Sequence, residues 1–329
     1  MKIWSLLPSV TEILFALGLD DEITGVTHEC DYPPQASTKP RVTFSYVDSS
    51  RDSGEIDRQV TERFRAGIQL YGIDEEQLRT NPPDLIVTQD LCPVCAVSPS
   101  DFEGHMESTG CRAEVVTLNP NRLRDILGDI RRIGEATGRA GEAERLTDEL
   151  EARIDAVRAA TGSATHDRPR VLCLEWLDPP MPAGHWVVEM IAIAGGDDGG
   201  LIASGAPSRK LAWQEMCAVD PEIVALMPCG FGPERAMQEA GVLWRLDGWA
   251  RLSAVRKGNV YALDGNGYFS RPGPRVVDGL EMLASVFRPD LFAKTPPNGS
   301  VLKLVSPPAG GSSVENWAPR FEPLIGVAS

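Results

Sequence analysis

The chain has 329 residues, of which 42% are hydrophobic, and a formal net charge of −15 at pH 7. This length allows two domains with separate cores. No stretch approaches the ~20 apolar residues that a membrane-spanning helix needs, so we expect no membrane insertion. The acidic balance argues against nucleic acid as a partner, because binding to phosphates needs clustered Lys and Arg.

The N-terminus begins directly on a predicted strand and lacks the charged segment, apolar stretch and cleavage site of a signal peptide. We therefore expect a cytoplasmic protein, or a periplasmic or otherwise extracytoplasmic one if a leader has been removed. The seven cysteines are odd in number and irregularly spaced. They do not suggest a disulfide framework, and reduced thiols fit a cytoplasmic protein.

Residues 1–119 are predicted to form an N-terminal α/β lobe. A first strand, Lys2–Leu7, leads to a capping-box spacing at residues 9–12 and a helix that stops at Gly18. A second helix is expected at Glu55–Tyr71, where residues 56, 60, 64, 68 and 71 form one apolar face. The other strands of this lobe are expected at Ile23–Thr27, Pro40–Thr43, Asp84–Thr88 and Glu114–Leu118.

Residues 120–162 are predicted to be a bridging helix. Apolar residues keep helical spacing from Leu123 to Val157, with an interruption at Gly138 and Gly141. About 40 helical residues would reach ~60 Å, which exceeds the diameter of one small domain. We therefore expect this helix to join two lobes and to be kinked or broken near Gly138.

Residues 163–292 repeat the α/β plan as a C-terminal lobe, and residues 293–329 are predicted to be a tail. The Pro-, Gly- and Ser-rich composition of the tail predicts loose attachment, although Val301–Val305 and Trp317 could pack. The chain thus reads as α/β, with two Rossmann-like lobes and a ligand cleft between them. In the second lobe, strands are expected at Arg170–Leu174, Ile223–Met227 and Val260–Leu263, and helices at His185–Ala194 and Val276–Phe287.

Polar, aromatic and cysteine residues gather directly after the predicted strands of both lobes. Ligands of open α/β sheets bind outside the carboxyl ends of the strands, so two facing lobes would enclose a cleft lined by six such loops. Aromatic rings in these loops would supply a stacking surface, although such rings are also common in cores. The candidate ligand-binding residues are His28, Glu29, Cys30, Tyr32, Phe44, Tyr46, Gln89, Asp90, Cys92, Glu175, Trp176, Trp186, Cys229, Phe231, Asn266, Tyr268, Phe269 and Arg271.

Four residues of these loops, His28, Cys30, Cys92 and Cys95, could hold a transition metal. With Cys229 they could converge on one soft ion if the cleft closes, whereas the alternative is that the cysteines are small buried hydrophobes. Cys92-x-x-Cys95 is half of a structural zinc site without its second half, and it is also compatible with a ligand contact or a redox pair. The metal and the structural interpretations both stay open on the sequence.

Five segments of the chain resemble the periplasmic vitamin B12-binding proteins, the cobalamin-binding components of ABC importers. The resemblance covers roughly residues 3–290 and is most specific at the opening motif. The segments are LPSVTEILFALGL at 7–19, GVTHECDYPPQA at 25–36, PPDLIVT at 82–88, LEWLDPP at 174–180 and YFSRPGPR at 268–275.

This resemblance implies the helical-backbone fold of substrate-binding proteins, in which little hinge motion occurs and the ligand is held between the lobes. It also implies that Phe44, Tyr46 and Gln89 stand where the family offers tryptophans to the corrinoid ring. We therefore expect a binding protein for cobalamin, another corrinoid or a related metal-containing ligand. An ABC permease would be its partner if the chain is exported.

Two other interpretations remain. The first is an enzyme that uses the cluster of His28, Glu29 and Cys30 on a small molecule or a corrinoid in the same cleft. No Ser-His-Asp signature, phosphate loop or dinucleotide fingerprint supports a specific reaction. The second is a regulatory or scaffold protein whose cleft is vestigial.

Overall fold

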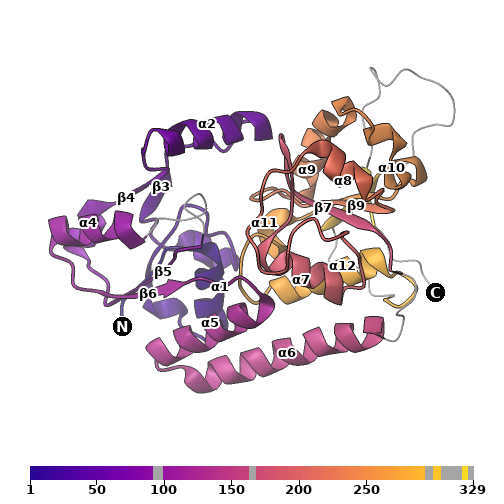
Figure 1. Ribbon diagram of the computed structural model, residues 1–329. Coiled ribbons are helices and arrows are strands. Elements are labelled where there is room, and N and C mark those ends of the chain that lie inside the picture. The colour runs from indigo at the N-terminus through magenta and orange to yellow at the C-terminus, as the bar shows by residue number, and fades with distance from the viewer. Residues whose placement is uncertain (92–98, 163–167, 293–298, 305–320, 325–329) are drawn as a thin grey trace. The chain divides into compact units, whose positions relative to one another are not determined.

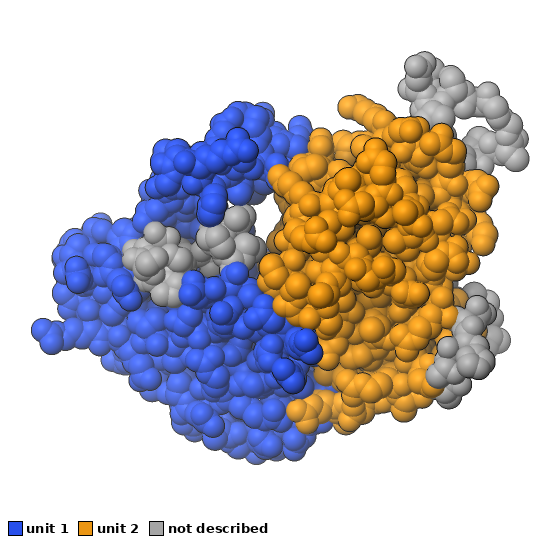
Figure 2. All heavy atoms as spheres, in the orientation of Figure 1, with its two compact units in different colours: residues 1–150, 272–274 blue, residues 151–271, 275–329 orange. Residues whose placement is uncertain are grey.

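The computed structural model describes residues 1–91, 99–162, 168–292, 299–304 and 321–324. The chain forms two compact units, which Figure 2 shows in separate colours. Unit 1 comprises residues 1–150 and 272–274, and unit 2 comprises residues 151–271 and 275–329. Each unit is built on its own sheet with helices packed against it, which confirms the predicted α/β class.

Unit 1 contains a four-stranded parallel sheet in the order β2-β1-β5-β6. Because β1 lies between two neighbours, its three residues are fully buried. One face of the sheet packs Trp4, Leu6 and Ile86 against Phe102 of α4. The bounds are β1 Ile3–Ser5, β2 Ile23–Val26, β5 Leu85–Gln89 and β6 Glu114–Leu118, with α1 Pro8–Ala16, α3 Glu75–Thr80, α4 Pro99–Thr109 and the 3-10 turns η1 Asp20–Glu22 and η2 Pro34–Thr38.

Helix α1 begins two residues earlier than the predicted capping box requires. Its N-cap is Leu7, Pro8 occupies the first helical position, and no side chain caps the helix. Proline is pre-organised for this position because its φ angle is fixed and its missing N–H would have no partner there. Ser9 is instead inside the helix, and its buried hydroxyl makes no hydrogen bond in the structure. The predicted capping box is therefore wrong.

A separate antiparallel ribbon, β3 (Thr43–Ser45) with β4 (Tyr71–Ile73), replaces two predicted features. The predicted strand Pro40–Thr43 is shifted, so that Phe44 lies in a strand and not in a loop after one. The predicted helix Glu55–Tyr71 is α2, Ser53–Arg65, and it ends before Tyr71. Between these strands the chain makes an excursion, residues 46–70, that carries α2 (Figure 1).

The early end of α2 has a local cause at Gly67. This glycine has a φ of 64°, a left-handed conformation that glycine adopts without steric cost. Gly67 N donates to Phe64 O and Ile68 N donates to Arg63 O, which is the hydrogen-bond pattern of a Schellman motif. The apolar spacing continues past Gly67, but the helix does not.

The predicted bridging helix is two helices, α5 (Leu123–Ala136) and α6 (Ala140–Gly162). The break lies at Gly138, which has a φ of 70°, and thus falls where the sequence predicts it. Helix α6 crosses from unit 1 to unit 2 after Leu150. In unit 2, its Arg153 is ion-paired with Asp278 at 2.5 Å and with Glu281 at 2.9 Å, both on α12.

Unit 2 contains a six-stranded mixed sheet in the order β12-β11-β10-β9-β7-β8. The central strands β7, β9 and β10 are parallel, so their carboxyl ends lie at one edge. As expected for Val301–Val305, part of the tail is packed, since β11 pairs with β10 and its Leu304 joins the core around Trp249. Val305 and Trp317 lie outside the described residues. The strands are β7 Val171–Leu177, β8 Pro180–Pro182, β9 Ile223–Leu226, β10 Val260–Leu263, β11 Val301–Leu304 and β12 Phe321–Pro323.

Helices cover both faces of this sheet. One face packs against α8, α10 and the turns η3 and η4, around the buried ring of Trp249. Helices α7 and α12 pack together on the other face (Figure 1). No helix in the described ranges is long and apolar enough to cross a membrane. The bounds are α7 His185–Ile193, α8 Trp213–Ala218, α9 Pro233–Glu239, η3 Ala240–Arg245, η4 Trp249–Arg251, α10 Ser253–Lys257, α11 Gly265–Tyr268 and α12 Val276–Phe287.

Candidate functional site

A buried network of hydroxyls and one thiol connects the elements at the carboxyl edge of unit 1. The Ser5 hydroxyl is 2.7 Å from that of Thr11, and the Thr11 hydroxyl is 3.1 Å from Cys30 Sγ. The Thr27 hydroxyl contacts the same sulfur at 3.2 Å, and Cys30 is only 1% exposed. Cys30 therefore holds the loop after β2 against β1 and α1, and its sulfur does not face solvent.

His28, in the same loop, is bound to β3. Its Nδ1 lies 2.9 Å from the Thr43 hydroxyl, and its ring packs 5.6 Å from that of Tyr71. Burial, followed by the charge of Arg41, lowers the pKa of His28 below its usual range. The imidazole is thus neutral near pH 7 and is tied to the ribbon.

The ribbon presents an exposed aromatic pair, Phe44 and Tyr46. Their rings meet edge to face at 5.2 Å between centroids, although 45% of Phe44 and 49% of Tyr46 are exposed. The guanidinium of Arg63, from α2, lies 5.0 Å from the Tyr46 centroid. Tyr32, after β2, is exposed as well. These rings are held in place by neighbours but are not covered by them.

The loop after β5 is described only at its start. Gln89 is the buried last residue of β5, and Asp90 is exposed and donates its backbone N–H to Leu118 O. Cys92 and Cys95 lie outside the described residues. Within the described ranges, no group of three or more His, Cys, Asp and Glu side chains could hold a metal ion. The predicted metal site stays a prediction.

In unit 2, the carboxyl ends of β7 and β9 bring together two aromatic rings and one guanidinium. Trp176 and Phe231 lie 5.5 Å apart between ring centroids. The Arg235 guanidinium lies 3.7 Å from the Phe231 centroid, a cation–π contact that leaves Phe231 only 2% exposed. Trp176 and Arg235 therefore form the outer surface of this cluster, with Phe231 beneath.

Glu175 connects three loops of unit 2. Its carbonyl accepts a hydrogen bond from Cys229 N at 3.0 Å, and its Oε2 accepts one from Gly184 N at 3.1 Å. Burial raises the pKa of this carboxyl, opposed by the hydrogen bonds from the Ser208 side chain and the Gly184 backbone. Cys229 itself is exposed. Glu175 thus positions the loop that carries Cys229 rather than presenting its own charge to solvent.

The loop after β10 carries the remaining candidates. Asn266 N donates to Phe231 O at 3.1 Å, and the buried Arg271 donates to Asn266 Oδ1 at 3.0 Å. Trp186 Nε1 donates to the Phe269 carbonyl at 3.0 Å, and both of these residues are buried. Trp186 and Phe269 therefore pack in the core of unit 2. The half-buried Tyr268 ring lies 5.4 Å from the Arg275 guanidinium.

The structure thus groups the candidates into two surfaces. His28, Tyr32, Phe44 and Tyr46 belong to unit 1, and Trp176, Cys229, Asn266 and Tyr268 belong to unit 2. Glu29, beside His28, is exposed. The sequence reasoning missed two cations that contact aromatic rings, Arg63 beside Tyr46 and Arg235 over Phe231. The sequence did contain a signal for Arg235. Gly232-Pro233 marks the start of a helix, and Arg235 follows Phe231 by four residues, the spacing that brings side chains together on a helix.

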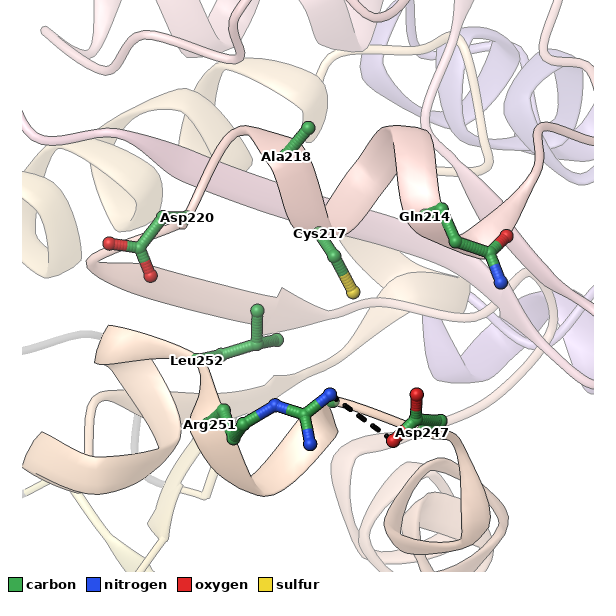
Figure 3. Close-up of a pocket in the computed structure, with 8 residues that line it drawn as sticks. Gln214, Cys217, Ala218, Asp220, Asp247, Arg251 and Leu252 are labelled. Carbon is green, nitrogen blue, oxygen red and sulfur yellow. Dashed lines mark hydrogen bonds and ion pairs between the residues drawn. The ribbon is translucent and has the colours of Figure 1, made fainter.

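A surface pocket of about 410 Å³ lies elsewhere on unit 2, between α8 and the segment of η4 (Figure 3). It adjoins Asp220, which precedes β9, and so it lies at the amino edge of the sheet, opposite Trp176. Figure 3 shows Cys217 and Arg251 reaching into it. Arg251 is paired with Asp247 at 3.2 Å, and Asp220 is bound by Ser253 and Arg170. These charges neutralise each other, and we assign the pocket no function.

Comparison with known proteins identifies the family. Residues 3–266 match the family model described as periplasmic binding protein. An uncharacterised ABC transporter substrate-binding lipoprotein from Bacillus subtilis is 25% identical over 296 residues, which are 88% of this chain and 81% of the relative. The vitamin B12-binding protein of Vibrio cholerae is 24% identical over 292 residues, covering 87% of this chain and 89% of the relative.

Among solved structures, the periplasmic haem-binding protein of Roseiflexus sp. RS-1 in its apo form is similar. It has a TM-score of 0.65 and 25% sequence identity, and the match covers 87% of this chain and 97% of that one. These relatives confirm the resemblance seen at the five sequence segments. Since the family model matches most of the chain, the protein belongs to the periplasmic binding protein family, as a two-lobed substrate-binding protein of the ABC-transporter type.

Proposed function

We propose that this protein binds a flat, metal-containing macrocycle, cobalamin or a related corrinoid first and haem second, and delivers it to an ABC permease. The observation that carries the proposal is the aromatic pair of Phe44 and Tyr46, which is fixed in geometry yet about half exposed. Ligand sites are lined by aromatic rings with a few polar groups that orient the ligand. A flat ring system is the ligand shape that stacking on such rings favours.

The relatives support this class of ligand. The Vibrio cholerae relative is named for vitamin B12 and the Roseiflexus structure for haem. Both names denote large planar macrocycles with a central metal. The ligand class, rather than one compound, is what the two names share.

Unit 2 offers a second surface that suits the edge of such a ligand. Trp176 supplies an aromatic ring, and the Arg235 guanidinium supplies a cation at the same cluster, over the neighbouring Phe231 ring. Guanidinium groups bind carboxylates and phosphates with charge-assisted hydrogen bonds. That one ligand contacts the surfaces of both units stays a prediction from the sequence resemblance.

Spectroscopic titration tests the proposal. The purified protein is titrated with cyanocobalamin and, separately, with haem, and the absorbance bands of each probe are followed. We expect one of them to bind with a dissociation constant in the micromolar range or below, and Phe44→Ala and Trp176→Ala to weaken that binding. If neither probe binds at micromolar concentration, the proposal is wrong.

Exposed-residue controls separate a stacking role from a general loss of fold. Phe64→Ala removes an exposed aromatic ring of α2 that has no aromatic neighbour among the recorded ring pairs of the described residues. We expect it to leave the affinity within about twofold, since truncation of an exposed side chain away from a site is usually neutral. A loss equal to that of Phe44→Ala would contradict the assignment of the site to the ribbon.

A further inference from the structure

Gly72 of β4 lies directly opposite Phe44 of β3 in the antiparallel ribbon. A Cβ atom added to Gly72 would lie 2.2 Å from Cζ of the Phe44 ring, and 2.5 and 2.9 Å from its two Cε atoms. Carbon atoms that are not bonded approach no closer than about 3.5 Å at their optimum. The ring therefore occupies the space that any side chain at position 72 would need.

The requirement for glycine here concerns space and not backbone conformation. The φ angle of Gly72 is not in the left-handed region, whereas that of Gly67 is. A glycine that lets an aromatic ring lie across the neighbouring strand is a known way of pairing strands. In this ribbon, the consequence is that the Cζ and Cε atoms of Phe44 lie against Gly72 of β4, while 45% of Phe44 stays exposed.

The position of Phe44 in turn determines the aromatic pair. The Phe44 ring meets Tyr46 edge to face at 5.2 Å, and Tyr46 is held from its other side by Arg63 and by its own N–H, which donates to Leu70 O. Tyr46 thus has two fixed neighbours besides Phe44. Phe44 has the β4 backbone at Gly72 as its support, so a side chain there would displace the ring toward solvent.

We propose that Gly72 is a specificity-determining positioning residue: its missing side chain leaves room for the Phe44 ring against β4 and so shapes the surface for a planar ligand. This inference rests on the proposed function. A residue larger than glycine at position 72 would displace the Phe44 ring from the ribbon. The pair would then lose its shape, and a flat macrocycle would lose stacking area on it.

A double-mutant cycle tests this coupling. The affinity for cyanocobalamin and for haem is measured in the wild type, G72A, F44A and the double variant F44A/G72A. We expect G72A to weaken binding about tenfold in the wild type and by less than about twofold in the F44A background, because the clash requires the ring. Gly128→Ala is the matched control, since a Cβ added at this helical glycine meets no atom within 4 Å.

Two readouts distinguish positioning from a loss of fold. The thermal midpoint and the near-ultraviolet circular dichroism of the aromatic rings are recorded for every variant. Phe44→Trp with Gly72 intact provides a second arm, because the larger ring can rest on the same glycine. We expect Phe44→Trp to bind at least as tightly as the wild type, and G72A added to it to remove that affinity.

The outcomes separate the inference from the function on which it rests. If the wild type binds neither probe, the proposed function fails, and the inference fails with it. If the wild type binds and G72A binds equally well, or weakens binding equally with and without Phe44, only the inference is overturned. A change confined to the backgrounds with an aromatic ring at position 44 supports it.

Discussion

At the scale of single residues, Asp129 on α5 is a buried carboxylate that the fold satisfies only in part. It is buried, one of its oxygens is 3.0 Å from Arg132, and Oδ2 makes no hydrogen bond in the structure. Burial raises the pKa of Asp129 to about 6, against a usual 3.8, despite the opposing Arg132. The folded protein thus holds a proton between about pH 4 and pH 6 that the unfolded chain has released.

It follows that Asp129 reduces the free energy of unfolding as the pH rises through that window. Proton uptake on folding makes stability fall with pH until the folded state is also ionised, above about pH 6. We expect Asp129→Asn to raise the free energy of unfolding at pH 7 by about 1–2 kcal/mol, less than the full shift because the half-exposed Arg132 loses its ion pair and keeps its bond to the Thr117 carbonyl. At pH 4 the difference should vanish.

Urea denaturation at pH 4, 5, 6 and 7 measures this dependence. Asp155→Asn serves as the control. The carboxylate of Asp155 is exposed, and in the part of the chain that the structure describes its ion pair is with Arg158, one turn further along α6. We expect that control to change stability by less than about 0.5 kcal/mol at every pH. An Asp129→Asn variant less stable than the wild type at pH 7 would show that the Arg132 ion pair outweighs the burial of the charge.

At the scale of elements, two glycines with equal space around them should respond oppositely to alanine. A Cβ added at Gly67 or at Gly128 meets no atom within 4 Å, so neither substitution causes a clash. Gly67 ends α2 with a φ of 64°, where a side chain costs about 1 kcal/mol. Gly128 lies inside α5, where alanine is favoured over glycine by about 0.8–1 kcal/mol.

We therefore expect Gly67→Ala to lower and Gly128→Ala to raise the free energy of unfolding, each by about 1 kcal/mol. Chemical denaturation of the two variants beside the wild type checks the signs. Because the volume added is the same in both, a shared sign would mean that packing, not backbone conformation, dominates at these positions.

The tail is a second case at this scale. Val301, Leu302 and Leu304 of β11 are buried, and β11 pairs with β10. Burial of one such side chain contributes about 1.5–3 kcal/mol. We expect a chain that ends at Phe292 to lose at least ~3 kcal/mol of stability, or to fail to fold, while a chain that ends at Leu324 keeps both strands and serves as the control. Equal melting temperatures would mean that β10 tolerates an open edge.

At the scale of the whole molecule, the sequence pattern predicted those helices and strands whose bounds depend only on neighbouring residues. Strand β6 and helix α12 have the predicted bounds, because turn residues enclose their apolar runs. The ribbon could not be predicted in this way, since Phe44 lies in β3 only because it meets Gly72 across an excursion of the chain. Likewise, the sequence left open whether Cys30 is a ligand or a buried hydrophobe, because one of the two hydroxyls that contact its sulfur, that of Thr11, comes from α1, 19 residues away.

The same limit applies to the candidate surfaces. His28 comes just after β2 and Phe231 shortly after β9, as expected for the carboxyl edges of the two sheets, whereas Phe44 lies within β3 of the separate ribbon. Which of them face outward depends on partners far along the chain. Trp186 and Phe269 bond to each other in the core, and Phe231 lies beneath Arg235. The loop sequences thus indicated where the candidate surfaces lie, but contacts with distant residues determine which side chains are exposed there.

Ligand binding should register in the stability of the molecule. A ligand that binds only the folded state at about 100 times its dissociation constant raises the free energy of unfolding by about 2.7 kcal/mol. We expect the macrocycle that titration identifies to raise the thermal midpoint, and Phe44→Ala to reduce that rise at the same ligand concentration because the dissociation constant increases.

Phe44 is half exposed, so its truncation should change the midpoint of the ligand-free protein little. The unliganded midpoint therefore serves as the internal control for each variant. If the ligand raised the thermal midpoint of Phe44→Ala as much as that of the wild type, the ligand would bind away from the ribbon. The exposure of Phe44 and Tyr46 would then require another explanation.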